Sequence, residues 1–231
     1  MTSSSLTVNN AIVPIPNTQK DFYNWEERRA LKVAQAASRS HDLIFVGDSI
    51  THMFEASERG LPVWEQHYGA YSTLNLGYGW DCTQNVLWRL QNGEFAGQQP
   101  RLLVLNIGTN NLTGNSGGRA NSAMEIVQGI AAIVELVHDA SPDTVVLQMG
   151  LLPRGKSDDA IFGKVKEVNT LLREWVEASP GILFSDIGAQ FLQPDGEIPL
   201  DLMNDRVHPT TAGYRIWAAT IDPIVRKCLG R

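Results

Sequence analysis

Short, almost continuously apolar segments alternate along the chain with longer segments in which apolar residues recur among charged ones. Five of the short segments are rich in Leu, Val and Ile and predict β-strands, at residues 43–46, 72–76, 102–107, 144–149 and 182–185. The longer segments predict helices at 18–40, 83–90, 119–139, 160–178 and 210–229. Apolar strands alternating with helices are typical of a parallel sheet covered on both faces. We therefore predict an α/β fold: a three-layer α/β/α sandwich around a central, mainly parallel, five-stranded sheet.

The chain divides into a short polar start and one long globular part. Residues 1–17 are rich in Ser, Thr, Asn and Pro, which predicts an irregular N-terminal arm along the surface. Residues 18–231 carry all the predicted strands and helices, and no internal repeat interrupts their order. Because 231 residues suffice for one large core, we expect residues 18–231 to form a single domain.

Composition and charge exclude several classes of protein. With 43% hydrophobic and 19% charged residues the chain reads as globular, and its net charge of -6 argues against a nucleic-acid partner. No apolar run approaches the roughly 18 residues of a membrane span, and the first residues lack a signal-peptide pattern. We expect a cytoplasmic protein. The cysteines, Cys82 and Cys228, lie far apart, which indicates neither a disulfide framework nor a zinc site.

Ser49 follows the first predicted strand, in the segment "LIFVGDSITH". In open parallel sheets, ligands bind beyond the carboxyl ends of the strands, so this is where chemistry is expected. A serine hydroxyl that attacks an acyl carbon needs a base in hydrogen-bond reach and donors for the oxyanion. Taken alone, however, a serine after a strand reads as a helix N-cap.

A base for Ser49 is offered by the segment "NDRVHPTTAGY", where Asp205 and His208 stand three positions apart. One short turn can place the two side chains together, so that Asp205 accepts from Nδ1 and Nε2 is left to take the serine proton. The helix start that follows favours the neutral imidazole. His52 is the rival base, but no orienting carboxylate of the same kind lies near it.

Oxyanion donors are offered by two further loops. Asn110, after the strand in "LLVLNIGTNN", carries a side-chain amide that can donate to a developing negative charge. In "LNLGYGWDCTQ", glycines at 77 and 79 let backbone N–H groups face a ligand. A dinucleotide fingerprint G-x-G-x-x-G is disfavoured there because position 82 is Cys82. The α/β-hydrolase elbow G-x-S-x-G is disfavoured because Thr51 replaces its second glycine.

These segments together resemble the four consensus blocks of a known family. "VGDSIT", "LNLGYGWD", "IGTNN" and "DRVHP" look like the blocks of the GDSL or SGNH hydrolases, in the same order and over residues 42–214. The stretch "NVLWRLQNGEFAG", residues 85–97, is similar to the corresponding stretch of platelet-activating-factor acetylhydrolase catalytic (alpha) subunits and their bacterial relatives.

The resemblance implies a flavodoxin-like serine esterase that hydrolyses short-chain, acetyl-type carboxylic esters through an acyl-enzyme, with no metal and no cofactor. It implies that Ser49 is the nucleophile, His208 the general acid and base, and Asp205 the residue that orients His208. It further implies an oxyanion hole made by the Ser49 N–H, a second-block backbone N–H and the Asn110 side chain. Asp48 then has a local structural role.

The second block departs from the family pattern at Trp80, where the resemblance places the oxyanion glycine, just before Asp81. Two interpretations follow. Either the Trp80 N–H donates while its indole walls a small acyl pocket, or the turn is shifted and Gly79 donates instead. If the family glycine needs a positive φ, a tryptophan there is strained.

Rival functions remain open at this stage. The same catalytic groups serve a carbohydrate acetylesterase or a thioesterase, and no residue pattern selects the leaving group. An alternative of another class is a catalytically weak scaffold subunit. The intact set of Ser49, Asn110, Asp205 and His208 argues against it. The expected partner is a small-molecule acyl ester, and a homodimer is compatible with this assignment.

Overall fold

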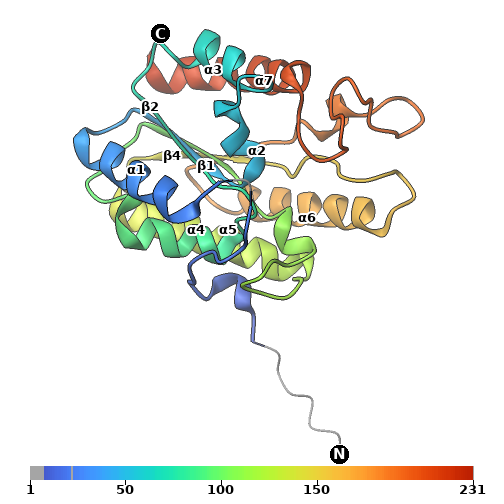
Figure 1. Cartoon of the computed structure of the whole chain (residues 1–231), viewed down its shortest axis with the longest axis horizontal. Coiled ribbons are helices and arrows are strands. Elements are labelled where there is room, and N and C mark those ends of the chain that lie inside the picture. The colour runs from blue at the N-terminus through green and yellow to red at the C-terminus, as the bar shows by residue number, and fades with distance from the viewer. Residues whose placement is uncertain (1–7, 22, 231) are drawn as a thin grey trace, which may run out of the picture.

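A five-stranded, wholly parallel sheet forms the centre of the computed structural model, which describes residues 8–21 and 23–230 (Figure 1). The strands lie in the order β2-β1-β3-β4-β5 and pair in parallel at every step. Their bounds are β1 (Leu43–Gly47), β2 (Thr73–Gly77), β3 (Leu102–Asn106), β4 (Val145–Met149) and β5 (Ile182–Ser185). Each agrees with its prediction to within one residue at either end.

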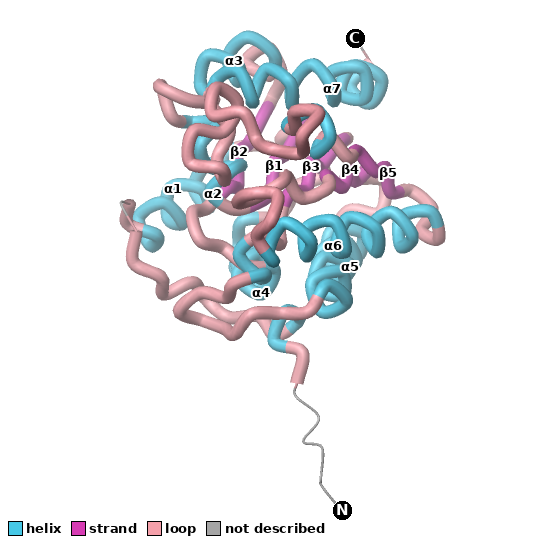
Figure 2. Tube along the Cα trace, turned by 90° about the vertical axis from the view of Figure 1, so that its right-hand side faces the viewer, coloured by secondary structure: helices cyan, strands magenta, loops and turns pink. Residues whose placement is uncertain are grey.

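Helices cover both faces of the sheet, which confirms the predicted three-layer sandwich. Figure 2 shows α3 and α7 on one side and α4, α5 and α6 on the other. Apolar side chains of α1 and of α4 to α6 form one core with one face of the sheet, and those of α2, α3 and α7 form a second core on the opposite face. The bounds are α1 (Trp25–Ser38), α2 (Ser49–His52), α3 (Leu61–His67), α4 (Thr83–Arg89), α5 (Ala123–Ala140), α6 (Ala160–Glu177) and α7 (Thr211–Leu229).

Two helices begin later than predicted because side chains cap them. The segment expected from residue 18 becomes helical only at Trp25, where Asn24 accepts from the N–H groups of Glu26 and Glu27. In α5 the Ser122 cap forms a reciprocal capping box with Glu125, which sets the start at Ala123 rather than 119. The short helix α3 was not predicted at all.

The predicted N-terminal arm falls partly outside the described residues, which begin at Val8. Asn10–Ile12 form a single 3₁₀ turn, and the described residues from Val13 to Asp21 form no helix or strand. Phe22, in the segment predicted as helix, also lies outside the described residues. None of the helices in these ranges is long and apolar enough to cross a membrane.

Two glycines at the carboxyl ends of neighbouring strands bring α2 onto the sheet edge. Gly47 of β1 and Gly77 of β2 stand side by side in the register. A Cβ at Gly77 would lie 2.2 Å from the backbone N of His52, and one at Gly47 would lie 2.2 Å from Thr51 Oγ1. Neither position has room for a side chain. The two glycines therefore allow α2 to sit directly on the strand ends, with Ser49 at its start.

Candidate active site

Ser49 is the first residue of α2, immediately after β1. The preceding Asp48 caps this short helix, since its Oδ1 accepts from the N–H of Ile50 at 2.9 Å. At this position the Ser49 N–H belongs to the helix N-terminus and has no intrahelical acceptor. The cap and the strand therefore present both the hydroxyl and the N–H of Ser49 at the sheet edge. Asp48 has the local structural role that the sequence suggested.

The structure brings Ser49, His208 and Asp205 into one chain of contacts. Ser49 Oγ lies 2.9 Å from His208 Nε2, although 159 positions separate the two residues. His208 Nδ1 lies 2.8 Å from Asp205 Oδ2. Asp205 Oδ1 accepts from the backbone N–H groups of Val207 at 3.0 Å and His208 at 2.7 Å. The carboxylate therefore fixes both the imidazole and the loop that carries it.

The rival base His52 lies in a different setting. Its ring packs edge-on against Tyr23, with 4.7 Å between the ring centroids. Burial, with help from the nearby Arg28 charge, lowers the pKa of His52 to about 3. The imidazole in contact with Ser49 Oγ is that of His208.

Arg59 supports the Asp205–His208 loop and was missed by sequence reasoning. Its Nη1 donates to the carbonyls of His208 at 3.2 Å and Pro209 at 3.1 Å, and its Nη2 lies 3.6 Å from Asp205 Oδ2. Burial raises the pKa of Asp205, but hydrogen bonds from the His208 N–H and ring and the Val207 N–H outweigh it and hold this pKa below its usual value. Asp205 is thus kept ionised beside the imidazole.

The second block forms a tight turn from Tyr78 to Asp81, in which the Asp81 N–H donates to the Tyr78 carbonyl at 3.3 Å. Trp80, the third residue of this turn, has φ +65°, whereas Gly79 does not lie in the positive-φ region. This is the pattern of a type II turn, whose third position normally takes glycine. Trp80 therefore carries the strain that the sequence pointed to, about 1–2 kcal/mol. Its side chain is 38% exposed.

Three hydrogen-bond donors near this turn have capacity to spare. Within the described ranges, neither the Gly79 N–H nor the Trp80 N–H has an acceptor. Asn110 is buried, and its Nδ2 donates to the Asp81 carbonyl at 3.1 Å. An asparagine amide has two N–H bonds, so one remains for a ligand. Residues predicted from separate blocks thus meet at one edge of the sheet.

Metal ligands do not gather at this edge. Across residues 8–21 and 23–230, no group of three or more His, Cys, Asp or Glu side chains is arranged to hold an ion. Cys82 and Cys228 are both free thiols, and Cys82 is buried.

Asp48 is expected to make stability depend on pH. Its carboxyl is fully buried, and in the described chain Oδ2 has no hydrogen-bond partner, so burial raises its pKa from the usual 3.8 to about 7. Between these values the unfolded chain loses a proton that the folded chain keeps, so the free energy of unfolding falls as pH rises. Midway between the two pKa values this slope approaches about 1.4 kcal/mol per pH unit.

Asp48→Asn should remove most of this slope, because the amide resembles the protonated acid. Urea unfolding of wild type and Asp48→Asn at pH 5, 6, 7 and 8 measures the effect. Asp143→Asn, at an exposed position, is the matched control and should keep the wild-type slope. Equal slopes in wild type and Asp48→Asn would show that Asp48 is ionised throughout this range.

Residues 45–216 match the profile of the GDSL-like Lipase/Acylhydrolase family. The chain is 33% identical over 201 residues to human platelet-activating factor acetylhydrolase IB subunit alpha1, covering 87% of this chain and 82% of the relative. A solved GDSL-like lipase from Bacteroides thetaiotaomicron superposes with a TM-score of 0.70 at 21% identity, over 87% of this chain and 97% of that one. An acetyl xylan esterase gives a TM-score of 0.67 at 20% identity, over 79% and 98%.

The sandwich fold and the profile match define the class: the chain belongs to the family of GDSL-like lipases and acylhydrolases. Its similarity to the acetylhydrolase subunit covers most of both chains. The protein is accordingly a carboxylic ester hydrolase.

Proposed function

We propose that this protein hydrolyses short-chain, acetyl-type carboxylic esters through an acyl-enzyme formed on Ser49. The observation that carries the proposal is the chain of contacts from Ser49 Oγ to His208 Nε2 at 2.9 Å and from His208 Nδ1 to Asp205 Oδ2 at 2.8 Å. A hydroxyl, an imidazole and a carboxylate in this order supply a nucleophile, a base and a group that orients the base.

In the first half-reaction, His208 Nε2 removes the Ser49 proton as Oγ bonds to the acyl carbon. His208 then returns this proton to the leaving alcohol when the ester bond breaks, which leaves the acyl group on Oγ. In the second half-reaction His208 takes a proton from water, whose oxygen attacks the acyl carbon, and Ser49 regains its proton as the acid departs. Asp205 stays ionised and stabilises the imidazolium in both steps.

The oxyanion of each tetrahedral intermediate needs donors already in place. The Ser49 N–H at the start of α2 and the spare N–H of Asn110 are two of them. The third is a backbone N–H of the Tyr78–Asp81 turn, from Trp80 or from Gly79.

An acetyl-sized substrate is favoured by the relatives. The human relative is named as an acetylhydrolase, and one structural neighbour is named as an acetyl xylan esterase. An acetyl ester of an alcohol, an acetylated carbohydrate and an acetyl thioester all present the same acyl carbon, so the leaving group has to be found by experiment.

The test is a screen of acyl length and leaving group, read out as turnover and as a covalent adduct. We expect p-nitrophenyl acetate to be hydrolysed at least about tenfold faster, by kcat/KM, than the octanoate. Acetylated xylo-oligosaccharide, an acetyl thioester and a 2-acetyl phospholipid form the leaving-group series. Mass spectrometry after rapid acid quench should find an acetyl group on the Ser49 peptide. Absence of both turnover and adduct would favour the scaffold role.

A further inference from the structure

The segment that precedes α1 holds the turn that carries Trp80. The Gly79 carbonyl accepts from Asn17 Nδ2 at 3.3 Å and from the Tyr23 hydroxyl at 3.1 Å. Asn17 is only 6% exposed, and Tyr23 is half-buried. These residues stand more than 50 positions before the turn, and neither lies in a motif that indicates catalysis.

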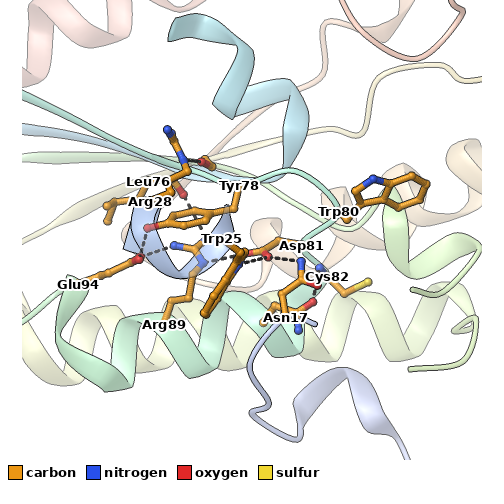
Figure 3. A network of polar contacts seen from close by, with 12 residues as sticks. Asn17, Trp25, Arg28, Leu76, Tyr78, Trp80, Asp81, Cys82, Arg89 and Glu94 are labelled. Atoms are coloured by element: carbon orange, nitrogen blue, oxygen red, sulfur yellow. Dashed lines mark hydrogen bonds and ion pairs between the residues drawn. The ribbon is translucent and has the colours of Figure 1, made fainter. Parts of the chain in front are cut away.

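Asn17 also binds the side chain of Asp81, one residue past Trp80. Its Nδ2 lies 2.8 Å from Asp81 Oδ1, so its two N–H bonds link the backbone and the carboxylate of the same turn. Asp81 Oδ2 accepts from Arg89 Nε at 2.6 Å, and both side chains are fully buried. Figure 3 shows this network gathered around Asp81, with the Trp80 indole pointing away from it.

The next two carbonyls of the turn are also bound by side chains. Asn115 Nδ2 donates to the Trp80 carbonyl at 2.9 Å, and Asn110 Nδ2 donates to the Asp81 carbonyl at 3.1 Å. Three successive carbonyls are therefore held, the first from the segment before α1 and the other two from the β3–α5 connection. We call the donors to these carbonyls the turn clamp: Asn17, Tyr23, Asn115 and Asn110.

The clamp determines where one N–H points. The described chain has no cis peptide bond, so the Trp80 N–H points opposite to the Gly79 carbonyl of the same planar peptide. Asn17 and Tyr23 hold that carbonyl towards the segment before α1, and the Trp80 N–H therefore faces away from that segment. In the described chain it has no acceptor, whereas the Asp81 N–H is used by Tyr78.

We propose that Asn17 is a positioning residue for ester hydrolysis, which with Tyr23 fixes the Gly79–Trp80 peptide so that the Trp80 N–H binds the oxyanion. This inference rests on the proposed function. It assigns the donor to Trp80 rather than Gly79. The clamp is needed because a tryptophan with φ +65° would otherwise relax towards negative φ and turn this N–H away.

The first test compares Asn17→Ala with Asn24→Ala. Asn24 lies in the same segment and caps α1, and among the described residues its side chain makes no hydrogen bond to the turn, so its loss should cost stability, about 1 kcal/mol, while the hydrogen bonds of the turn stay in place. We expect Asn17→Ala to lower kcat for p-nitrophenyl acetate by about 10- to 100-fold with KM within about threefold, since one oxyanion donor is misplaced. Asn24→Ala should keep kcat within about twofold. Tyr23→Phe, which removes only the hydroxyl, should lower kcat by about three- to tenfold and serves if Asn17→Ala folds poorly.

The second test repeats Asn17→Ala in a Trp80→Gly background. Glycine accepts φ +65° without strain, so the turn should depend less on the clamp to keep its conformation. Asn17→Ala should then reduce kcat at least about fivefold less than it does with Trp80 present. Two results would overturn the positioning role, provided that Ser49→Ala is inactive. One is an equal kcat for Asn17→Ala and Asn24→Ala. The other is an Asn17→Ala substitution that lowers kcat by the same factor with Trp80 and with Gly at position 80. A wild type without hydrolysis, or an active Ser49→Ala, would overturn the proposed function and this inference with it.

Discussion

Ser49→Ala is expected to lower kcat for p-nitrophenyl acetate by about 10⁴-fold or more, the loss typical when a serine nucleophile is removed. The reason is that, among the residues the structure describes, Ser49 Oγ is the hydroxyl that contacts His208 Nε2, at 2.9 Å. A 10⁴-fold loss corresponds to about 5.4 kcal/mol in the activation barrier. Initial rates, measured at saturating ester and corrected for spontaneous hydrolysis, give the value.

Ser57→Ala is the matched control for this substitution. Ser57 is exposed, and its hydroxyl donates to the carboxylate of the neighbouring Glu58. Its removal should leave kcat within about twofold of wild type, as expected for a surface position. If Ser49→Ala, freshly purified and correctly folded, retained more than about a tenth of the activity, Ser49 would not be the nucleophile.

Strands β1 to β4 were predictable because they are buried almost throughout on both faces of the sheet, whereas the edge strand β5 is only partly buried. Burial on both faces demands continuous apolar runs, and residues 43–46 and 102–107 show this directly. The helix α3 was not predictable in the same way. It has seven residues, and its N-cap, Gly60, makes no side-chain capping bond. Its conformation is decided by the packing of Val63 and Trp64 against distant core residues, which no local pattern records.

Site residues that lie inside a motif were predicted, and those that support them were not. Ser49 and His208 were linked by the order of their blocks at strand ends. Arg59, Asn17 and Arg89 stand outside or between these blocks. Arg59 and Asn17 act through contacts with residues far along the chain, and Arg89 through a buried contact with Asp81, eight positions away. A lone arginine or asparagine carries no periodic signal, so only the folded chain reveals its partner.

Trp80 shows the same limit at a single position. The sequence identified it as a departure from the family pattern and gave the condition for strain. It did not give the φ of +65°, which depends on donors from two other segments, the one before α1 and the β3–α5 connection.

Arg89→Met is expected to lower the free energy of unfolding by about 3–5 kcal/mol, the usual cost of breaking a buried ion pair by removing one partner. Arg89, Asp81 and Glu94 are all fully buried. The guanidinium pairs with Asp81 at 2.6 Å and with Glu94, and it lies 3.9 Å over the centre of the Tyr78 ring. Without it, two carboxylates share a dry site. Urea titration at pH 8, followed by tryptophan fluorescence, gives the change.

Arg226→Met is the matched control for the buried pair. Arg226 is 63% exposed and pairs with Asp222 at 2.8 Å on the surface of α7, so its removal should cost about 0.5 kcal/mol or less. The triple variant Arg89→Met, Asp81→Asn, Glu94→Gln should recover part of the lost stability, because it leaves no buried charge uncompensated. Equal unfolding free energies for Arg89→Met and Arg226→Met would mean that the buried network contributes little.

The pH dependence of the destabilisation in Arg89→Met distinguishes a loss of charge compensation from a loss of packing. Burial raises the pKa of Asp81 to about 6, and the Arg89 charge opposes this rise. In Arg89→Met that opposition is lost, so the pKa of Asp81 should rise further. A raised acid pKa contributes stability at low pH that is lost as pH rises. The gap between wild type and Arg89→Met should therefore narrow from pH 8 to pH 5, whereas a packing defect would keep it constant. In the triple variant neither amide titrates, so positions 81 and 94 should add no pH dependence to its stability.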